Sequence, residues 1–94
     1  MAQFIVRHKV QDYNKWKPVF DEHSTTRKAA GSKGGRLYRN AENPLELIIL
    51  WDWDTLENAQ KFGHSPDLRE TMMRAGVADQ PDVFYLDEIE RLAV

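Results

Sequence analysis

Two of the three histidines in this chain stand where an imidazole could act as a general base. His23 follows Phe20 by three residues and precedes Arg27 by four, so the three side chains share one face of a predicted helix. An imidazole titrates near neutrality, which suits proton abstraction from an acidic carbon or a phenol, and the forked guanidinium of Arg27 suits the resulting anion. His8, inside an apolar segment, is the second candidate base. For both histidines the alternative is a hydrogen-bonded structural residue without a chemical role.

The same residues do not indicate a metal centre or a cofactor. The chain has no cysteine, and its three histidines fall on different predicted elements, without the i, i+4 spacing of a zinc-binding helix. The glycine-rich stretch 31–35 lacks the residue order of a phosphate-binding loop and follows a helix instead of a strand. We therefore predict no metal site and no cofactor.

The elements that must position these residues follow from hydrophobic spacing and capping signals. Asp12, Asp54 and Ser65 are predicted N-caps, the second with Glu57 as a capping box and the third followed by Pro66. Pro18 predicts either a kink in the first helix or a separate first turn. Strands are predicted at residues 3–10, 36–41, 45–53 and 82–92, with helices at residues 12–30, 54–63 and 65–75. The order is β-α-β-β-α-β, the α+β ferredoxin-like pattern of a four-stranded antiparallel sheet with helices on one face.

The segment 45–53 predicts a partner for this sheet, because both of its faces are apolar. A strand with one solvated face alternates apolar and polar residues, whereas Ile48 and Leu50 here oppose a second apolar row made of Leu45, Leu47, Ile49, Trp51 and Trp53. Two helical segments can cover only one face. We therefore predict a homodimer whose sheets pack face to face, the alternative being a monomer with a modest apolar patch.

Length, composition and charge limit the number of domains, the kinds of partner and the location that we expect. The chain has 94 residues, which predicts a single domain over residues 1–94, and its net charge of −2 does not favour a nucleic-acid partner. Its first residues lack the apolar region of a signal peptide, and no window approaches the roughly 18 apolar residues of a membrane span. We expect a soluble, cytoplasmic protein with neither a nucleic-acid nor a membrane partner.

Three passages give the chain a resemblance to a known family. They are Asp-Tyr-x-x-Trp-Lys-x-x-Phe-Asp at 12–21, Trp53-Asp54 with Ala59 and Phe62, and Ser65-Pro66-x-Leu68-Arg69. With these, the chain resembles the antibiotic-biosynthesis-monooxygenase-like proteins of the dimeric α+β barrel superfamily. The resemblance implies a homodimeric barrel and covers nearly the whole chain. It specifies chemistry poorly, because the superfamily includes oxygenases, haem-degrading enzymes, cyclases and proteins of no known activity.

One branch of that superfamily, the haem-degrading enzymes, can be compared with this chain residue by residue. Haem-degrading members are known for an asparagine on the first strand and for a tryptophan and a histidine on the second helical segment. The first strand here contains no asparagine, and the other two positions fall on Phe62 and Met72. Neither side chain supplies the indole donor or the imidazole ligand that this chemistry uses, so we do not expect haem degradation by that route.

The resemblance also implies where a ligand would bind, namely between the helices and the sheet. We predict His23 or His8 as the catalytic base, with substrate binding by Arg27, Trp16, Phe20, Tyr38, Trp51 and Met72. The implied activity is a cofactor-independent monooxygenase or related enzyme acting on an aromatic or polyketide-like substrate. The alternative is a non-catalytic ligand-binding or structural dimer. An open cavity facing either histidine would favour the enzyme, and a space packed solid by aromatic side chains would exclude it.

Overall fold

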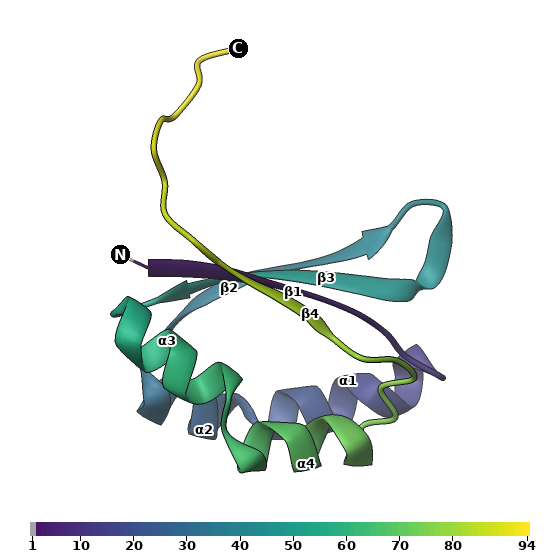
Figure 1. The fold of residues 1–94 in the computed structure, drawn as a ribbon. Coiled ribbons are helices and arrows are strands. Elements are labelled where there is room, and N and C mark those ends of the chain that lie inside the picture. Colours follow the sequence, from purple (N-terminus) through teal and green to yellow (C-terminus); the bar gives the residue numbers. More distant parts are fainter. Residues whose placement is uncertain (1) are drawn as a thin grey trace.

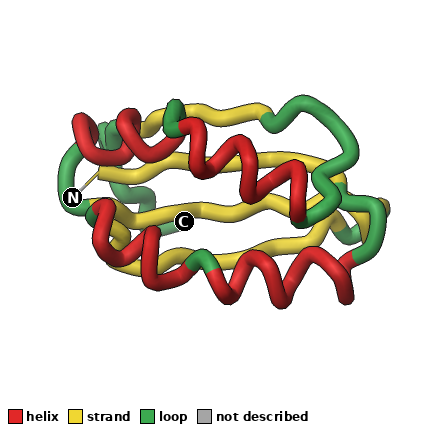
Figure 2. Tube along the Cα trace, turned by 90° about the horizontal axis from the view of Figure 1, so that it is seen from below, coloured by secondary structure: helices red, strands yellow, loops and turns green. Residues whose placement is uncertain are grey.

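A single antiparallel sheet with helices on one face makes up the fold (Figure 1). The computed structural model describes residues 2–94, with elements β1 (Ala2–Lys9), α1 (Tyr13–Glu22), α2 (Ser24–Ala30), β2 (Ser32–Asn40), β3 (Asn43–Trp53), α3 (Leu56–Gly63), α4 (Pro66–Arg74) and β4 (Asp82–Leu86). The strand order is β2-β3-β1-β4, and Figure 2 shows the helices running along the strands. This confirms the predicted ferredoxin-like order, with a pair of helices at each helical position. Within residues 2–94, no helix is long and apolar enough to cross a membrane.

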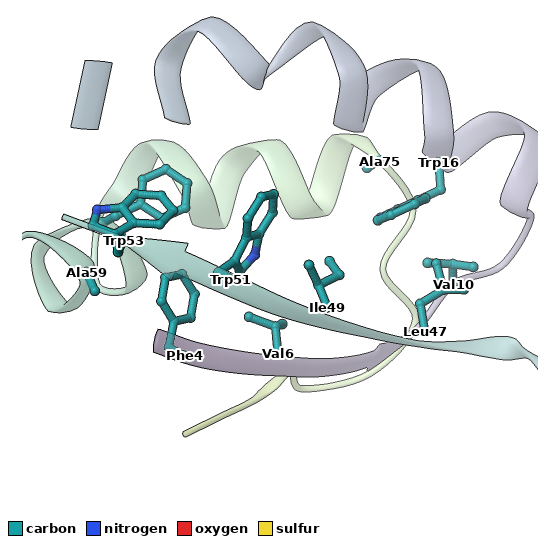
Figure 3. Packing of buried hydrophobic residues seen from close by; sticks show 11 residues of the cluster. Phe4, Val6, Val10, Trp16, Leu47, Ile49, Trp51, Trp53, Ala59 and Ala75 are labelled. Atoms are coloured by element: carbon teal, nitrogen blue, oxygen red, sulfur yellow. The ribbon is translucent and has the colours of Figure 1, made fainter. Parts of the chain in front are cut away.

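The core lies between the sheet and the helices, because alternate residues of the central strands β1 and β3 point to that side (Figure 3). Phe4 pairs with Trp51 and Val6 with Ile49, and all four side chains are buried on this inner face. Ile48 and Leu50 alternate with Ile49 and Trp51, so they lie on the outer face of the sheet. The predicted division of β3 into two apolar faces is therefore confirmed.

The first helix is interrupted at His23 and not at Pro18, where the sequence predicted a kink or a separate turn. Pro18 lies inside α1, which continues to Glu22, and α2 begins at Ser24. Proline removes one hydrogen bond of the helix, but Trp16 on one side of it is buried in the core and Phe20 on the other packs against that core. The predicted N-cap is confirmed, since the Asn14 N–H donates to Asp12 Oδ1 at 2.9 Å.

Of three further element boundaries, two differ from the prediction and one is confirmed. Gly31, with φ of +124°, ends α2 in a conformation that favours glycine, so β2 begins directly after it, at Ser32 and not near residue 36. The N-cap of α3 is Thr55 and not Asp54, because the Asn58 N–H donates to the Thr55 hydroxyl at 3.1 Å. The predicted Ser65 cap of α4 is confirmed by the hydrogen bond from the Leu68 N–H to Ser65 Oγ, also 3.1 Å.

The last strand is shorter than predicted, ending at Leu86 instead of residue 92. β4 is an edge strand that pairs only with β1, and the last pair of that ladder joins Gln3 to Leu86. Within residues 2–94, the chain after Leu86 pairs with no strand. It leaves the sheet on the side opposite the helices (Figure 1).

Candidate functional site

A small cavity of about 50 Å³ lies between the inner face of the sheet and the helices. It is enclosed mostly by apolar and aromatic side chains, together with two histidines, one arginine and one threonine. The lining residues are Phe4, Val6, His8, Trp16, Phe20, His23, Arg27, Ile49, Trp51, Phe62, Leu68, Thr71, Met72 and Ala75. The space is thus neither packed solid nor large enough for a ring system, since an engineered cavity that binds benzene measures about 150 Å³.

His8 stands out within this cavity because its imidazole finds no hydrogen-bond partner within residues 2–94. β1 points the ring into the core, where the residue is 2% exposed, and neither Nδ1 nor Nε2 is bonded to any of the described residues. The ring lies edge-on to that of Trp16, with 5.7 Å between centroids. Burial lowers the pKa of His8 below its ordinary value, with the negative charge of Asp79 opposing this in part. A neutral imidazole with both nitrogens free can accept a proton from a ligand and donate one back.

Arg27 supplies a buried positive charge to the same cavity. The residue is 8% exposed, and its guanidinium carbon lies 4.1 Å from the ring centroid of Phe20 and 5.0 Å from that of Trp51. Its Nη1 donates to the backbone carbonyl of Phe20 at 2.7 Å, and within residues 2–94 it forms no ion pair. Burial lowers the pKa of Arg27, although an arginine keeps its charge in proteins. An anionic ligand would give this cation the partner that the chain does not provide.

His23 differs from His8 because it already has an acidic partner. Its Nε2 lies 2.8 Å from Asp67 Oδ2, which joins the junction of α1 and α2 to the first turn of α4. His23 is 7% exposed, whereas the Asp67 side chain is 63% exposed. If Nε2–H donates to the carboxylate, Nδ1 is the free acceptor. The pair therefore fixes the orientation of the His23 ring at the wall of the cavity.

Stacked aromatic rings form the wall nearest to Arg27. Trp16 and Phe20 stack with centroids 4.5 Å apart, and Phe20 and Trp51 stack at 5.8 Å. Trp53 belongs to the core alone, since it is fully buried, does not line the cavity and donates from Nε1 to the Ala30 carbonyl at 3.1 Å.

The structure gathers all but one of the predicted site residues around the cavity. The exception is Tyr38, which the structure places away from the cavity. Tyr38 pairs with Ile48, so it lies on the outer face of the sheet and is 46% exposed. Sequence reasoning missed Asp67 and the buried Thr71. Asp67 stands 44 positions from His23 and follows a Ser-Pro cap, where an acidic residue is ordinary in a helix, so the sequence carries no signal for its pairing.

A second and larger hollow adjoins the cavity. It is an open groove of about 600 Å³ between α4 and β4. Leu68 and Met72 line both spaces. The remaining groove residues are Gly63, His64, Ser65, Arg69, Met73, Val77, Ala78, Asp79, Gln80, Pro81, Val83 and Tyr85.

No protein-family model and no curated protein matches the chain, whereas several solved structures do. A candidate antibiotic biosynthesis monooxygenase from Bordetella bronchiseptica superimposes with a TM-score of 0.76 at 23% identity, over 95% of this chain and 97% of that one. SnoaB, a cofactor-independent oxygenase from Streptomyces nogalater, also gives 0.76, at 12% identity over 99% and 97%. Rv0793 from Mycobacterium tuberculosis gives 0.71, at 15% identity over 98% of each chain.

The chain has the antibiotic-biosynthesis-monooxygenase fold. The resemblance predicted from the three sequence passages is thereby confirmed as a likeness of fold. Identities of 23% or less show the fold and not the reaction, so the chemistry of this chain depends on the residues of its own cavity.

Proposed function

We propose that the cavity binds the acidic end of an aromatic or polyketide-like small molecule, and that His8 removes a proton from it. The observation that carries this proposal is a neutral imidazole that has no hydrogen-bond partner within residues 2–94 and shares a small, mostly apolar cavity with a guanidinium that forms no ion pair there. An acidic C–H or phenol O–H would give its proton to His8, and the resulting carbanion or phenolate would lie close to the charge of Arg27. The mostly apolar walls strengthen this attraction because they lower the local dielectric constant.

The reaction that we propose is oxygenation without a cofactor, since SnoaB, which shares the fold, is a cofactor-independent oxygenase. A substrate carbanion has the electrons to reduce dioxygen directly. A CH₂ group between two activating groups would become a carbonyl, with one oxygen atom entering the product and the other leaving as water. The substrate supplies all four electrons, so no external reductant is needed.

Oxygen uptake with anthrone, whose acidic CH₂ lies between two aromatic rings, tests this proposal. We expect uptake without added cofactor, with one anthraquinone formed per dioxygen consumed. His8→Phe and Arg27→Met should each lower the rate at least tenfold, a typical contribution of one general base or one charge contact. Uptake no faster than in buffer would contradict the oxygenase and leave the alternative, a protein that binds its ligand without converting it.

We further propose that the protein works as a homodimer joined through the outer face of the sheet. Ile5 lies between Leu50 and Phe84 in the strand register, and Phe84 is 60% exposed. The nearby charge of Arg7 is already neutralised, with Nε 2.6 Å from Glu46 and Nη1 3.0 Å from Asp82. A second copy would bury this apolar row, with Arg7 already paired and with Arg36, which pairs with Leu50 in the register, at its β2 end.

A further inference from the structure

The cavity is too small for the ligand class proposed above, so most of such a ligand must lie elsewhere. About 50 Å³ is a third of the roughly 150 Å³ that accommodates one benzene ring. The adjoining groove offers about 600 Å³, inside the range of roughly 300–1,000 Å³ that is typical of small-molecule sites. The two spaces together match a molecule of several fused rings, and neither does so alone.

Two flexible side chains separate the spaces. Leu68 and Met72 lie one turn apart on α4 and line the cavity on one side and the groove on the other. Methionine is unbranched and adapts easily to a new shape, so a change of its rotamer can join the two spaces without moving the backbone.

The inner end of the groove is also suited to a flat ring system. Tyr85 and His64 lie there with ring centroids 6.2 Å apart, and Tyr85 in turn packs against Phe4 of the cavity wall at 5.7 Å. Gly63 makes room for this arrangement, because a Cβ at that position would collide with the Tyr85 hydroxyl. Burial raises the pKa of Tyr85, so at neutral pH its ring and hydroxyl are uncharged.

We infer that the groove between α4 and β4 is the outer half of a two-part site, and that Leu68 and Met72 form a movable partition. The fused rings of a polycyclic phenol or enol occupy the groove, while its acidic end passes the partition to reach the cavity. This inference rests on the proposed binding of an acidic ligand beside His8 and Arg27, and it adds the size of the ligand and its way in.

Equilibrium dialysis with two probes tests the inference separately from the proposed function. Danthron is a three-ring phenol that is already a quinone, so its binding can be measured without the proposed oxygenation. Para-nitrophenol has a single ring. Both probes are measured by their own absorbance. Ala78→Trp fills the groove, and Ala29→Trp is the matched control on the exposed side of α2, outside both spaces. Met73→Trp is a second filling variant, since Met73 also lines the groove and is 75% exposed.

We expect Ala78→Trp and Met73→Trp to weaken danthron binding at least tenfold and to weaken para-nitrophenol binding much less, with no change in Ala29→Trp. Only the hydroxyl end of para-nitrophenol enters the cavity, and its single ring lies at the partition and not in the outer groove. Met72→Ala should speed the association of both probes several-fold in stopped-flow measurements, whereas Leu56→Ala, on α3 outside both spaces, should not. Danthron affinity that is unaffected by both filling variants would overturn the two-part site alone. Binding of neither probe, or binding indifferent to His8→Phe and Arg27→Met, would overturn the proposed function and this inference with it.

Discussion

Burying His8 costs stability, but it leaves the imidazole nitrogens available to a ligand. Its imidazole is buried with two polar nitrogens that find no partner among residues 2–94. An unsatisfied buried polar group costs about 1–3 kcal/mol, so an apolar residue of similar size would suit the core better. Strained or unsatisfied groups of this kind gather at functional sites, where a ligand completes them.

Replacing His8 should therefore separate stability from binding. We expect His8→Phe to raise the free energy of unfolding by about 1 kcal/mol, because the unpaired nitrogens are removed and the small cavity accepts the larger ring. Urea denaturation measures the stability, and para-nitrophenol dialysis should show at least a tenfold loss of affinity. A stability loss above about 1 kcal/mol would instead show that His8 makes hydrogen bonds on which the fold depends.

The same residue should make the stability of the protein depend on pH. In the unfolded chain the pKa of His8 is near 6.5, whereas burial lowers it in the folded protein. Between the two values the unfolded chain binds more protons, so acidification favours unfolding. We expect this contribution to be fully present above pH 6.5 and to be lost as the pH falls through 6.5 towards the folded pKa. Urea titrations between about pH 5 and 8 should show it, and His8→Phe should lack it.

At the scale of elements, the contact between His23 and Asp67 ties the two halves of the helical layer together. His23 lies at the junction of α1 and α2, and Asp67 lies in the first turn of α4. Because the Asp67 side chain is largely exposed, water screens the pair, and its contribution to global stability is small. Its main effect is to hold α4, and with it Leu68 and Met72, against the cavity.

Breaking this contact should loosen α4 more than it destabilises the protein. We expect Asp67→Ala to lower the free energy of unfolding by less than about 1 kcal/mol while the amides of α4 exchange several-fold faster with deuterium. Glu70→Gln, an exposed acid on the same helix, serves as the control. Unchanged exchange in α4, or a global loss of several kcal/mol, would contradict this role.

The elements and most of the site could be predicted because their signals are local. Alternation in β3 and the capping residues Asp12 and Ser65 depend on neighbours a few positions away, and they predicted the strand, the helices and the face that carries His8. Tyr38 was misplaced because its face depends on the register between β2 and β3, which no local pattern specifies. Asp67 and the end of β4 likewise depend on which distant residues become neighbours.

At the scale of the whole molecule, the sheet presents an inner face that holds the site and an outer face that has no cover. Leu50, Ile5 and Phe84 form an apolar row across three strands of the outer face, and Ile48 lies two positions from Leu50 on the same face. The extended residues after Leu86 leave the sheet on this same side, where they expose Ile89 and Leu92 (Figure 1). Both features are consistent with the proposed homodimer.

A charge placed in this row should separate the dimer. We expect Phe84→Lys to give a monomer at micromolar concentration, because two lysines would be brought together in an apolar interface without partners. Leu56→Lys, on the helical side of the molecule, should remain a dimer like the wild-type protein. Native mass spectrometry measures both, and a monomeric wild-type protein would contradict the dimer.

The ionisation state of bound para-nitrophenol tests the central claim most directly, namely that the cavity holds an acidic ligand as its anion. At a pH where the free probe is mostly neutral, we predict that the bound probe shows the visible absorption band of the phenolate, because His8 accepts the proton and Arg27 attracts the charge. The band should disappear in Arg27→Met and weaken in His8→Phe. A probe that binds in its neutral form, or a phenolate band that persists in Arg27→Met, would contradict the account.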